Sequence, residues 1–389
     1  MSTIIYSMCG EGRGHATRVQ TIVEMLVPRY RFILLAPRDA YQQLYSRFED
    51  HPHVSVRRLP GLFFAYRKNK VDYFRSLLSS IPYLFRLNAA VRYLVHMIER
   101  DKPVLAITDF EPLLPRAAKK CKVPWISLDH QHFLSASDSK LLSFNLRWRI
   151  SLLRSVIPLF YRGQHGEAIS SFAHLPPRRG TESIRRLGVM LRDDFLRAKM
   201  ISRNDSHLLI YIRKHAPYSF WTAIEKSGRN AIVYGLGTSP PNAKDLSNRI
   251  IFKDIANEEF VRDLARCECL ITTAGNQLIG EAYFLGKPVL AIPEEGNFEQ
   301  QLNGWLVANS GCGWATTFTD FNLHVLQQFL LAIPLLRNAL SDDQKNSTFY
   351  GNDAAIEFIR AHLPATDCEN HAEPFSGRFQ ESAETELIT

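Results

Sequence analysis

The chain has 389 residues, of which 46% are hydrophobic and 22% are charged. This composition excludes a fibrous or wholly disordered chain, and the length suits two domains of ordinary size. Lysine and arginine number 47 against 39 for aspartate and glutamate, which gives a net charge of +8. Such an excess indicates an anionic partner: phosphate groups on a substrate, an acidic membrane surface, or nucleic acid.

The spacing of the cysteines and the N-terminal segment indicate the cell compartment in which we expect the protein. The six cysteines show no paired C-x-x-C spacing with histidine partners, so neither a zinc site nor a disulfide framework is predicted. A strand-like segment at residues 4–8 is too short for a signal peptide. No run reaches the ~18 apolar residues of a membrane span. We therefore expect a cytoplasmic protein, whose membrane contact is limited to the surface, at the inner face of the cytoplasmic membrane.

Short apolar runs that each end in a polar turn recur along the first half of the chain. A helix is expected over residues 15–26, after the first of these runs, and further helical stretches separate the later ones. Strands that alternate with helices predict a doubly wound parallel sheet. The expected strands are residues 3–8, 31–37, 54–59, 104–109 and 124–129.

The second half repeats this scheme, which predicts an α/β protein of two Rossmann-like domains. Its expected strands are residues 207–212, 230–236, 249–253, 269–273 and 288–293, and its expected helices are residues 256–266, 277–285 and 299–309. The run Pro-Pro-Arg-Arg-Gly, which starts at Pro176, marks a linker. Asn352-Asp353 can cap a last helix. The expected parts are an N-terminal acceptor domain at 1–175, a linker at 176–190, a nucleotide-sugar domain at 191–345, a helix able to cross back at 346–363, and a disordered tail at 364–389.

The densest cluster of functional residue types lies at residues 272–304. After a strand, Ala274, Gly275 and Asn276 form a tight turn into a helix. The free backbone N–H groups at such a helix start attract a phosphate, and a glycine lets it approach closely. Glu281 lies on the first two turns of this helix and can accept hydrogen bonds from ribose hydroxyls. We therefore expect a nucleotide at this turn.

A later helix of the same stretch opens with Glu299-Gln300, which present an acceptor and an amide to the same crevice. Such a pair suits a sugar ring with several hydroxyls. Each piece taken alone also fits an ordinary Rossmann-like repeat that binds nothing. The order and spacing of the pieces together favour a binding site.

The pattern A-G-x(5)-E-x(4)-G-x-P-x(4)-P followed by E-Q-x-x-N resembles the donor-site signature of GT-B glycosyltransferases, in particular family 28. That family includes the N-acetylglucosaminyltransferase that makes lipid II and the galactolipid synthases. The resemblance implies two facing Rossmann-like domains and a nucleotide-sugar co-substrate, with no cofactor. It places Gly275 at the diphosphate, Glu281 at the ribose, and Glu299 and Gln300 at the sugar hydroxyls, while Asn303 supports the last helix.

Two further segments extend the resemblance, and two depart from it. Gly188-x-x-x-Arg192 resembles the family's Gly-Asn-Pro-x-Arg, whose arginine helps neutralise the diphosphate, and Phe252-Lys253 would offer backbone groups to the base. The family's Gly-Gly-Ser turn is absent after the first strand of the second half, which reads IYIRKHA, and Asn276-Gln277 replace small or hydroxyl residues. The departures imply a donor that is held differently, or a different nucleotide sugar.

The glycine loop GEGRGH at residues 10–15 follows the first strand and opens a helix. As a dinucleotide fingerprint it is imperfect, because G-x-G-x-x-G needs a glycine at position 15; a nicotinamide-dinucleotide site and a purely structural turn stay open. We favour His15 as a general base, because a histidine at this helix start faces the crevice and accepts a proton near neutral pH. The loop resembles the GT-B family's Gly-x-Gly-His loop, which places Gly12 and Gly14 by the donor and Arg18 by the acceptor or phosphate.

Polar residues follow two other expected strands, Asp109 and Glu111 after one and His130 and His132 after the next. Asp-x-Glu can imitate the metal-binding Asp-x-Asp of the other glycosyltransferase architecture, but Pro112 suits a turn into a helix, so substrate positioning or polar capping is preferred. The histidines can pair as zinc ligands, but no third ligand is evident. We therefore expect acceptor-binding residues at these positions and no metal.

Residues 57–95 and 141–162 mix aromatic residues and leucine with arginines and almost no acids. This composition suits interfacial helices on an anionic bilayer, and it suits core helices with snorkelling arginines equally well. Lipid-acceptor members of the resembled family meet the membrane through the N-terminal domain, which implies a lipid-linked acceptor. Nucleic acid is not expected, because no nucleic-acid fold signature accompanies these segments.

The residues and the resemblance together predict a hexosyltransferase-type glycosyltransferase. It would move a sugar from a nucleotide-sugar, UDP-linked donor to an acceptor hydroxyl of the cell envelope, with inversion and without a metal. Two other functions stay open: a nucleotide-sugar epimerase on the same scaffold, and a non-catalytic nucleotide- or lipid-binding module.

Overall fold

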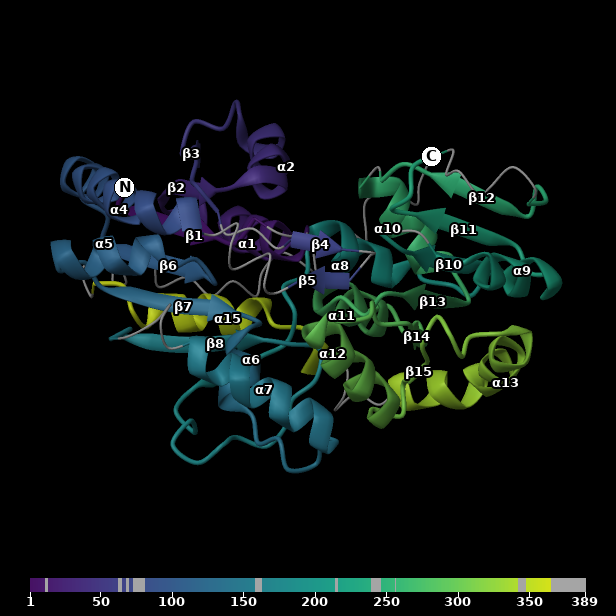
Figure 1. Ribbon diagram of the computed structural model, residues 1–389. Helices are drawn as coiled ribbons and strands as arrows, with labels where there is room; N and C mark the ends of the chain where they lie inside the picture. Colours follow the sequence, from purple (N-terminus) through teal and green to yellow (C-terminus); the bar gives the residue numbers. More distant parts are fainter. Residues whose placement is uncertain are drawn as a thin grey trace, which may run out of the picture.

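The computed structural model describes most of the chain and places it in two domains that lie side by side (Figure 1). Each domain is built on a parallel sheet with helices on both faces, as the alternating elements predict. The described residues are 1–10, 13–61, 65–67, 70–72, 81–157, 163–213, 216–238, 246–255, 257–341 and 348–364.

The first sheet has seven strands in the described residues, in the order β3-β2-β1-β6-β7-β8-β9, all parallel. All five strands expected in this half are present. The strand order reverses direction at β1, whose neighbours are β2 and β6, and ligands of such folds bind at this point. The strands are β1 (Thr3–Met8), β2 (Arg31–Ala36), β3 (Val54–Arg58), β6 (Leu105–Asp109), β7 (Trp125–Asp129), β8 (Gly166–Ser170) and β9 (Arg185–Leu187).

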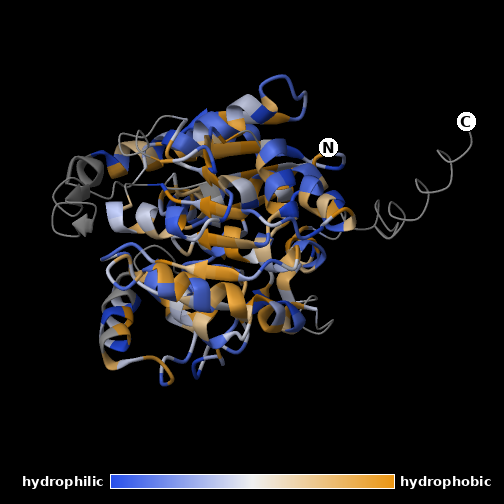
Figure 2. Cartoon of the chain, turned by 90° about the vertical axis from the view of Figure 1, so that its right-hand side faces the viewer, coloured by the Kyte–Doolittle hydropathy of each residue, from blue (hydrophilic) through white to orange (hydrophobic). Residues whose placement is uncertain are grey.

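Alternate residues of these strands enter opposite layers of the core, because side chains of a strand point to its two faces in turn. Ile4 and Tyr6 pack in one buried cluster and Ile5 in another. Figure 2 shows the result, with hydrophobic strands inside and hydrophilic colour on the outer helix faces. The helices of this domain are α1 (Arg13–Leu26), α2 (Arg38–Phe48), α4 (Ile81–Asp101), α5 (Leu113–Cys121), α6 (His132–Ala136) and α7 (Phe144–Val156).

The basic aromatic segment at 57–95 falls partly outside the described residues. A short antiparallel pair, β4 (Ala65–Arg67) and β5 (Lys70–Asp72), lies within it. Helix α4 packs against α5 and buries Val91 and Leu94 in the core. This described part of the segment is therefore a core helix rather than an interfacial one.

The second sheet has six strands in the described residues, in the order β12-β11-β10-β13-β14-β15, again all parallel. The five strands and three helices expected here are all present, and the edge strand β15 is additional. The strands are β10 (Leu208–Tyr211), β11 (Ala231–Tyr234), β12 (Ile250–Lys253), β13 (Cys269–Thr272), β14 (Val289–Ala291) and β15 (Gly313–Ala315). The helices are α8 (Asp193–Met200), α9 (Tyr218–Lys226), α10 (Asn257–Arg266), α11 (Asn276–Phe284), α12 (Phe298–Asn309) and α13 (Leu323–Leu340).

Helix α13 is long and apolar enough to cross a membrane by length and composition, which no other helix of the described chain is. It packs against α9 and buries Leu326, Phe329 and Ile333 in the core of the second domain. The helix therefore covers one face of the second sheet in this fold.

The junction between the domains differs in detail from the expected linker. Strand β9 lies within the expected linker range of 176–190 but belongs to the first sheet. The last helix, α15 (Asn352–Arg360), returns to pack on α1, and it is the yellow helix behind β7 and β8 in Figure 1. Its N-cap residue is Gly351 rather than Asn352. The Asn352 side chain instead bonds both the N–H and the carbonyl of Leu191, at 2.7 Å each, which fastens the junction.

Candidate active site

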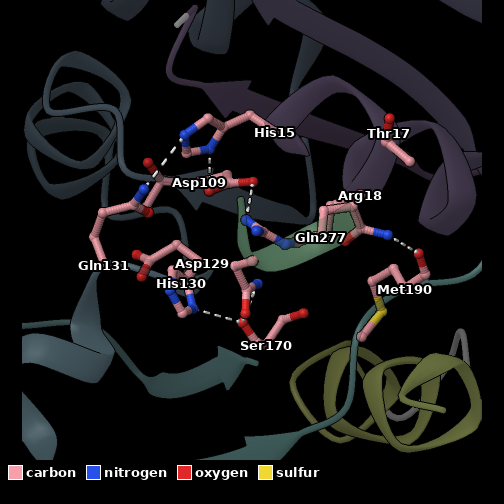
Figure 3. A network of polar contacts seen from close by, with 12 residues as sticks. His15, Thr17, Arg18, Asp109, Asp129, His130, Gln131, Ser170, Met190 and Gln277 are labelled. Carbon is pink, nitrogen blue, oxygen red and sulfur yellow. Dashed lines mark hydrogen bonds and ion pairs between the residues drawn. The ribbon is translucent and has the colours of Figure 1, made fainter. Parts of the chain in front are cut away.

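Polar side chains gather where β1, β6 and β7 end, next to the start of α1 (Figure 3). His15 Nδ1 lies 2.8 Å from Asp109 Oδ1, and Arg18 Nη1 donates to Asp109 Oδ2 at 2.7 Å. The Asp109 and Arg18 side chains are 0% and 3% exposed. Asp109 Oδ1 accepts from His15 Nδ1 when the imidazole proton lies on that nitrogen, and this contact favours that tautomer. His15 therefore presents its Nε2 as a proton acceptor.

Arg18 and Asp109 were expected to bind the acceptor, and the structure places them behind His15 instead. Both are buried in their mutual ion pair, and Asp109 also contacts the imidazole of His15. His15 itself is 8% exposed and lies at the front of the group. Gly12 lies outside the described residues. Gly14 lies in the first turn of α1, directly before His15.

Glu111 also differs from its expected role as an acceptor ligand. Its two carboxylate oxygens accept from the backbone N–H groups of Leu113 and Leu114, at 2.7 and 2.9 Å. It thus caps α5, which is the polar capping that the sequence left open. Burial raises the pKa of Glu111 to about 7.

The two expected acceptor histidines have separate environments. His132 Nδ1 lies 2.7 Å from Asp129 Oδ2, and burial opposes the charged form while this carboxylate raises the pKa of His132. His130 Nδ1 bonds the carbonyl of Ser170 at 3.1 Å, and burial lowers the pKa of His130. Only His130 faces the second domain, with Nε2 3.9 Å from Glu299 Oε1. No group of three or more potential ligands able to hold a metal occurs among the described residues.

Gln131, which the sequence did not single out, lies between the two domains. Its Nε2 is 3.4 Å from His15 Nε2 and 3.4 Å from Glu299 Oε2 (the contact to His15 is drawn in Figure 3). A polar residue after a strand end was the available signal, but the flanking histidines were the more conspicuous candidates. The side chain therefore joins the base of the first domain to the expected sugar ligand of the second.

The turn before α11 leaves an open position at the helix start. Gly275 has an ordinary φ of −71°, and a Cβ added there would meet nothing within 4 Å. Local backbone geometry thus does not require glycine at this position, whereas Ala274, at φ 63°, takes the left-handed conformation. No side chain caps α11, and Asn303 Nδ2 holds the turn through the carbonyl of Ala274 at 3.0 Å. The space is suited to a ligand with acceptor oxygens.

Asn276 and Gln277, which depart from the family pattern, connect the domains. Asn276 donates to the carbonyl of Ser170 and accepts from the N–H of Phe172, both at 3.2 Å. Gln277 Nε2 donates to the carbonyl of Met190 at 2.7 Å, as Figure 3 shows. These buried amides fix the start of α11 against the first domain.

Glu281 and Arg192 lie close behind this turn. Glu281 accepts from Gln277 Nε2 at 3.0 Å, and burial raises the pKa of Glu281 to about 7, against the opposing charge of Arg192. Arg192 is 8% exposed and pairs with Asp194 at 3.1 Å. Both side chains are buried.

The remaining expected donor residues lie on β12 and α12. Lys253 Nζ pairs with Glu259 at 2.6 Å and with Asp263 at 2.8 Å, so its ammonium group is held by these two carboxylates. Glu299 is 37% exposed at its side chain. Gln300 Oε1 accepts from the N–H of Glu294 at 2.8 Å, which orients its amide nitrogen toward solvent-accessible space.

A cleft of about 590 Å³ separates α2 of the first domain from the ends of β10 and β11 in the second. The sequence had not indicated α2 as a wall of the site. A nucleoside-sized ligand fits such a volume. The lining residues are Asp39, Gln42, Gln43, Ser46, Tyr211, Arg213, Gly235 and Ile255.

The fold and this site define the class of protein. Two doubly wound parallel-sheet domains face each other so that the helix starts at Gly14 and Gln277 adjoin, with a ligand-sized cleft between the domains. This is the GT-B architecture of glycosyltransferases. The chain belongs to glycosyl transferase family 1, whose family model matches residues 2–334. No curated protein sequence matches the chain.

Solved structures share the fold across nearly the whole chain. The calicheamicin glycosyltransferase CalG4 has a TM-score of 0.65 at 14% identity, covering 96% of this chain and 100% of its own. MurG of Acinetobacter baumannii has a TM-score of 0.59 at 11% identity, covering 93% and 100%. UGT71G1 of Medicago truncatula, complexed with UDP-glucose, has a TM-score of 0.61 at 13% identity, covering 92% and 98%. These matches confirm the predicted GT-B fold, and the family model confirms the predicted glycosyltransferase superfamily.

Proposed function

We propose that the protein transfers a hexose from a UDP-sugar to an acceptor hydroxyl, with inversion and without a metal. The observation that carries this proposal is the pair formed by His15 and Asp109 at the edge of the first sheet. The acceptor O–H gives its proton to His15 Nε2, and its oxygen attacks the anomeric carbon of the donor sugar. The bond from that carbon to the diphosphate breaks, and Asp109 stabilises the imidazolium that forms.

The diphosphate leaving group is assigned to the start of α11. The open position at Gly275 admits phosphate oxygens to the uncapped helix start, where the helix dipole favours negative charge. Arg192, near Glu281, adds a positive charge. Fixed donors of this kind stabilise charge as it develops on the leaving group.

The other parts of the donor follow from this placement. The nucleoside enters the cleft beside α2, with the backbone of Phe252 and Lys253 near its base. Glu281 contacts the ribose from inside the turn. Glu299 and Gln300 hydrogen-bond the sugar hydroxyls. UDP-glucose in the complex of UGT71G1 supports a UDP-linked donor for this fold.

An exposed apolar and basic surface on α7 supports a membrane-associated acceptor. Leu141, Phe144 and Trp148 are 68%, 76% and 58% exposed, and the Arg147 guanidinium lies over the Phe144 ring at 6.0 Å. Aromatic side chains with arginines bind the interface of an anionic bilayer. We therefore assign this surface to the inner face of the cytoplasmic membrane and the acceptor, at His130, to a lipid-linked molecule.

Vesicle binding tests the membrane assignment. Sedimentation with vesicles of 30% phosphatidylserine should pull down the protein, and neutral phosphatidylcholine vesicles should not. Phe144→Ser with Trp148→Ser should abolish binding, whereas Tyr218→Ser, at a 63% exposed site of the second domain, should leave it unchanged. Equal binding to both kinds of vesicle, or no loss in the double variant, contradicts the assignment.

A thermal-shift screen of UDP, UDP-glucose and UDP-N-acetylglucosamine tests the donor assignment. A ligand at 100 times its Kd stabilises the folded state by about 2.7 kcal/mol, so the Tm should rise measurably. NMR of the donor sugar then separates the functions: an epimerase interconverts it without any acceptor, and a binding module leaves it intact under all conditions. If no nucleotide sugar raises the Tm, the proposed function is wrong.

A further inference from the structure

The amide of Gln131 occupies the position that an acceptor hydroxyl needs for proton transfer to His15. Its Nε2 lies 3.4 Å from His15 Nε2, the nitrogen that the Asp109 contact leaves without a proton. The same amide nitrogen lies 3.4 Å from Glu299 Oε2 on the other domain. One side chain thus contacts both the base and the carboxylate assigned to the donor sugar.

The chemistry of its two neighbours fixes the orientation of this amide. His15 Nε2 offers a lone pair and Glu299 offers carboxylate oxygens, so both are acceptors. The NH₂ group of Gln131 satisfies both with its two protons. The opposite orientation would set the amide oxygen against two acceptors, which is repulsive. Gln131 is therefore a donor to the base in the ligand-free protein.

The backbone around Gln131 is anchored, so the side chain alone can leave this position. On one side His130 bonds the Ser170 carbonyl, and on the other His132 bonds Asp129 through both its ring and its N–H. Gln131 Oε1 is buried without a partner among the described residues. An unmade hydrogen bond of a buried amide is unfavourable, which makes rotation away from this resting position easier.

We propose that Gln131 is a positioning residue that covers His15 Nε2 until the donor binds. This inference rests on the proposed function, because it takes Glu299 as a ligand of the donor sugar. Sugar hydroxyls that donate to Glu299 weaken its hold on the Gln131 amide, which rotates and uncovers the base for the acceptor hydroxyl. The arrangement imposes donor-before-acceptor order.

Modification of His15 by diethyl pyrocarbonate tests the cover in the free, full-length protein. Mass spectrometry of the peptide that carries His15 gives the rate, and His96, whose side chain is 81% exposed, serves as the internal reference. Gln131→Met keeps the side-chain volume and removes the donor. It should raise the rate at His15 about five-fold, the equivalent of one hydrogen bond of about 1 kcal/mol, without a change at His96. A wild-type rate at His15 in Gln131→Met overturns the proposal.

Glu299→Gln provides a second, independent variant. A neutral amide at this position binds the NH₂ group of Gln131 less strongly than a carboxylate does. It should also speed modification of His15, by less than Gln131→Met does. If UDP-glucose neither binds nor turns over, the proposed function fails for this donor. The modification rates at His15 still show whether Gln131 covers its Nε2. Unchanged rates with normal turnover refute the cover alone.

Discussion

His15 Nδ1 and Asp109 Oδ1 lie 2.8 Å apart although 94 residues separate them along the chain. The contact exists because β1 and β6 are neighbours in a parallel sheet, so that the start of α1 and the end of β6 meet at the same edge. The central strand pair of the first domain thereby assembles a base and its orienting carboxylate. The candidate chemistry follows from sheet topology rather than from a local motif.

Replacement of Asp109 tests the orienting role. Asp109→Asn removes the charge that holds the His15 proton on Nδ1, so the rate of UDP release in the presence of acceptor should fall at least about 100-fold. Asp129→Asn is the matched control, because Asp129 is equally buried at the next strand end but pairs with His132. The control should lose stability comparably yet keep most of the rate. Equal rates in the two variants would argue against the assignment.

Substitution of Gly275 should weaken ligand binding without affecting folding. Gly275→Ala should leave the Tm unchanged, since φ is ordinary and the added Cβ meets nothing, while the Kd for UDP should rise about ten-fold. Gly280→Ala on the same helix is the contrasting change, because its Cβ would lie 2.5 Å from Val189 Cγ1. That variant should lose about 1–3 kcal/mol of unfolding free energy. Calorimetry of unfolding and of UDP binding measures both, and a Tm loss in Gly275→Ala contradicts the account.

Glu281 makes stability depend on pH. Burial raises its pKa from 4.5 to about 7, so folding favours the protonated form. The stabilisation is therefore complete below pH 4.5 and is lost as pH rises to about 7. Glu281→Gln should match wild type near pH 4.5 and exceed it at pH 8 by roughly 3 kcal/mol. Urea unfolding of the ligand-free protein at both pH values gives the difference, and parallel pH curves for the two proteins contradict this prediction.

The amide of Asn276 joins the phosphate turn to the first domain through Ser170 and Phe172. Asn276→Ala leaves a buried N–H and a buried carbonyl without their partner, so the unfolding free energy should fall by about 2–3 kcal/mol. Hydrogen exchange at Phe172 should accelerate in the same variant. Asn309→Ala, an exposed position on α12, should do neither. If the Phe172 N–H keeps its protection from hydrogen exchange in Asn276→Ala, the Asn276 contacts are not needed to hold the turn against the first domain.

The hydrophobic periodicity of the sequence and its turn residues predicted the strands and helices of both domains well. Apolar runs followed by polar turns identified ten strands of the two sheets, because the inner strands are buried on both faces and read as continuous apolar segments. Strands β8, β9 and β15 were missed. Strands β9 and β15 have only three residues, which carry little pattern, and β8 opens with a glycine and a glutamate that interrupt the apolar run. The glycine turn and His15 were visible because helix starts have local signatures.

The finer arrangement of the site depended on contacts across the two domains. Nothing near Arg18 or Asp109 in the sequence shows that each is buried by the other. Gln131 acquires its importance from His15 and Glu299, which lie 116 and 168 residues away. Glu111 illustrates the opposite error, because a helix cap and an acceptor ligand look alike at a strand end. Contacts of this kind depend on how the two domains pack against each other. Local patterns in the sequence do not show that packing.

Replacement of His15 tests the central claim most directly. With the UDP-sugar identified by the thermal-shift screen and membrane lipids supplied as acceptor, His15→Gln should bind the donor with wild-type Kd, keep its Tm within a few degrees, and lose at least about 100-fold in kcat. That combination assigns the imidazole to proton transfer rather than to folding or donor affinity. Sugar transfer by His15→Gln at the wild-type rate would contradict the proposed mechanism.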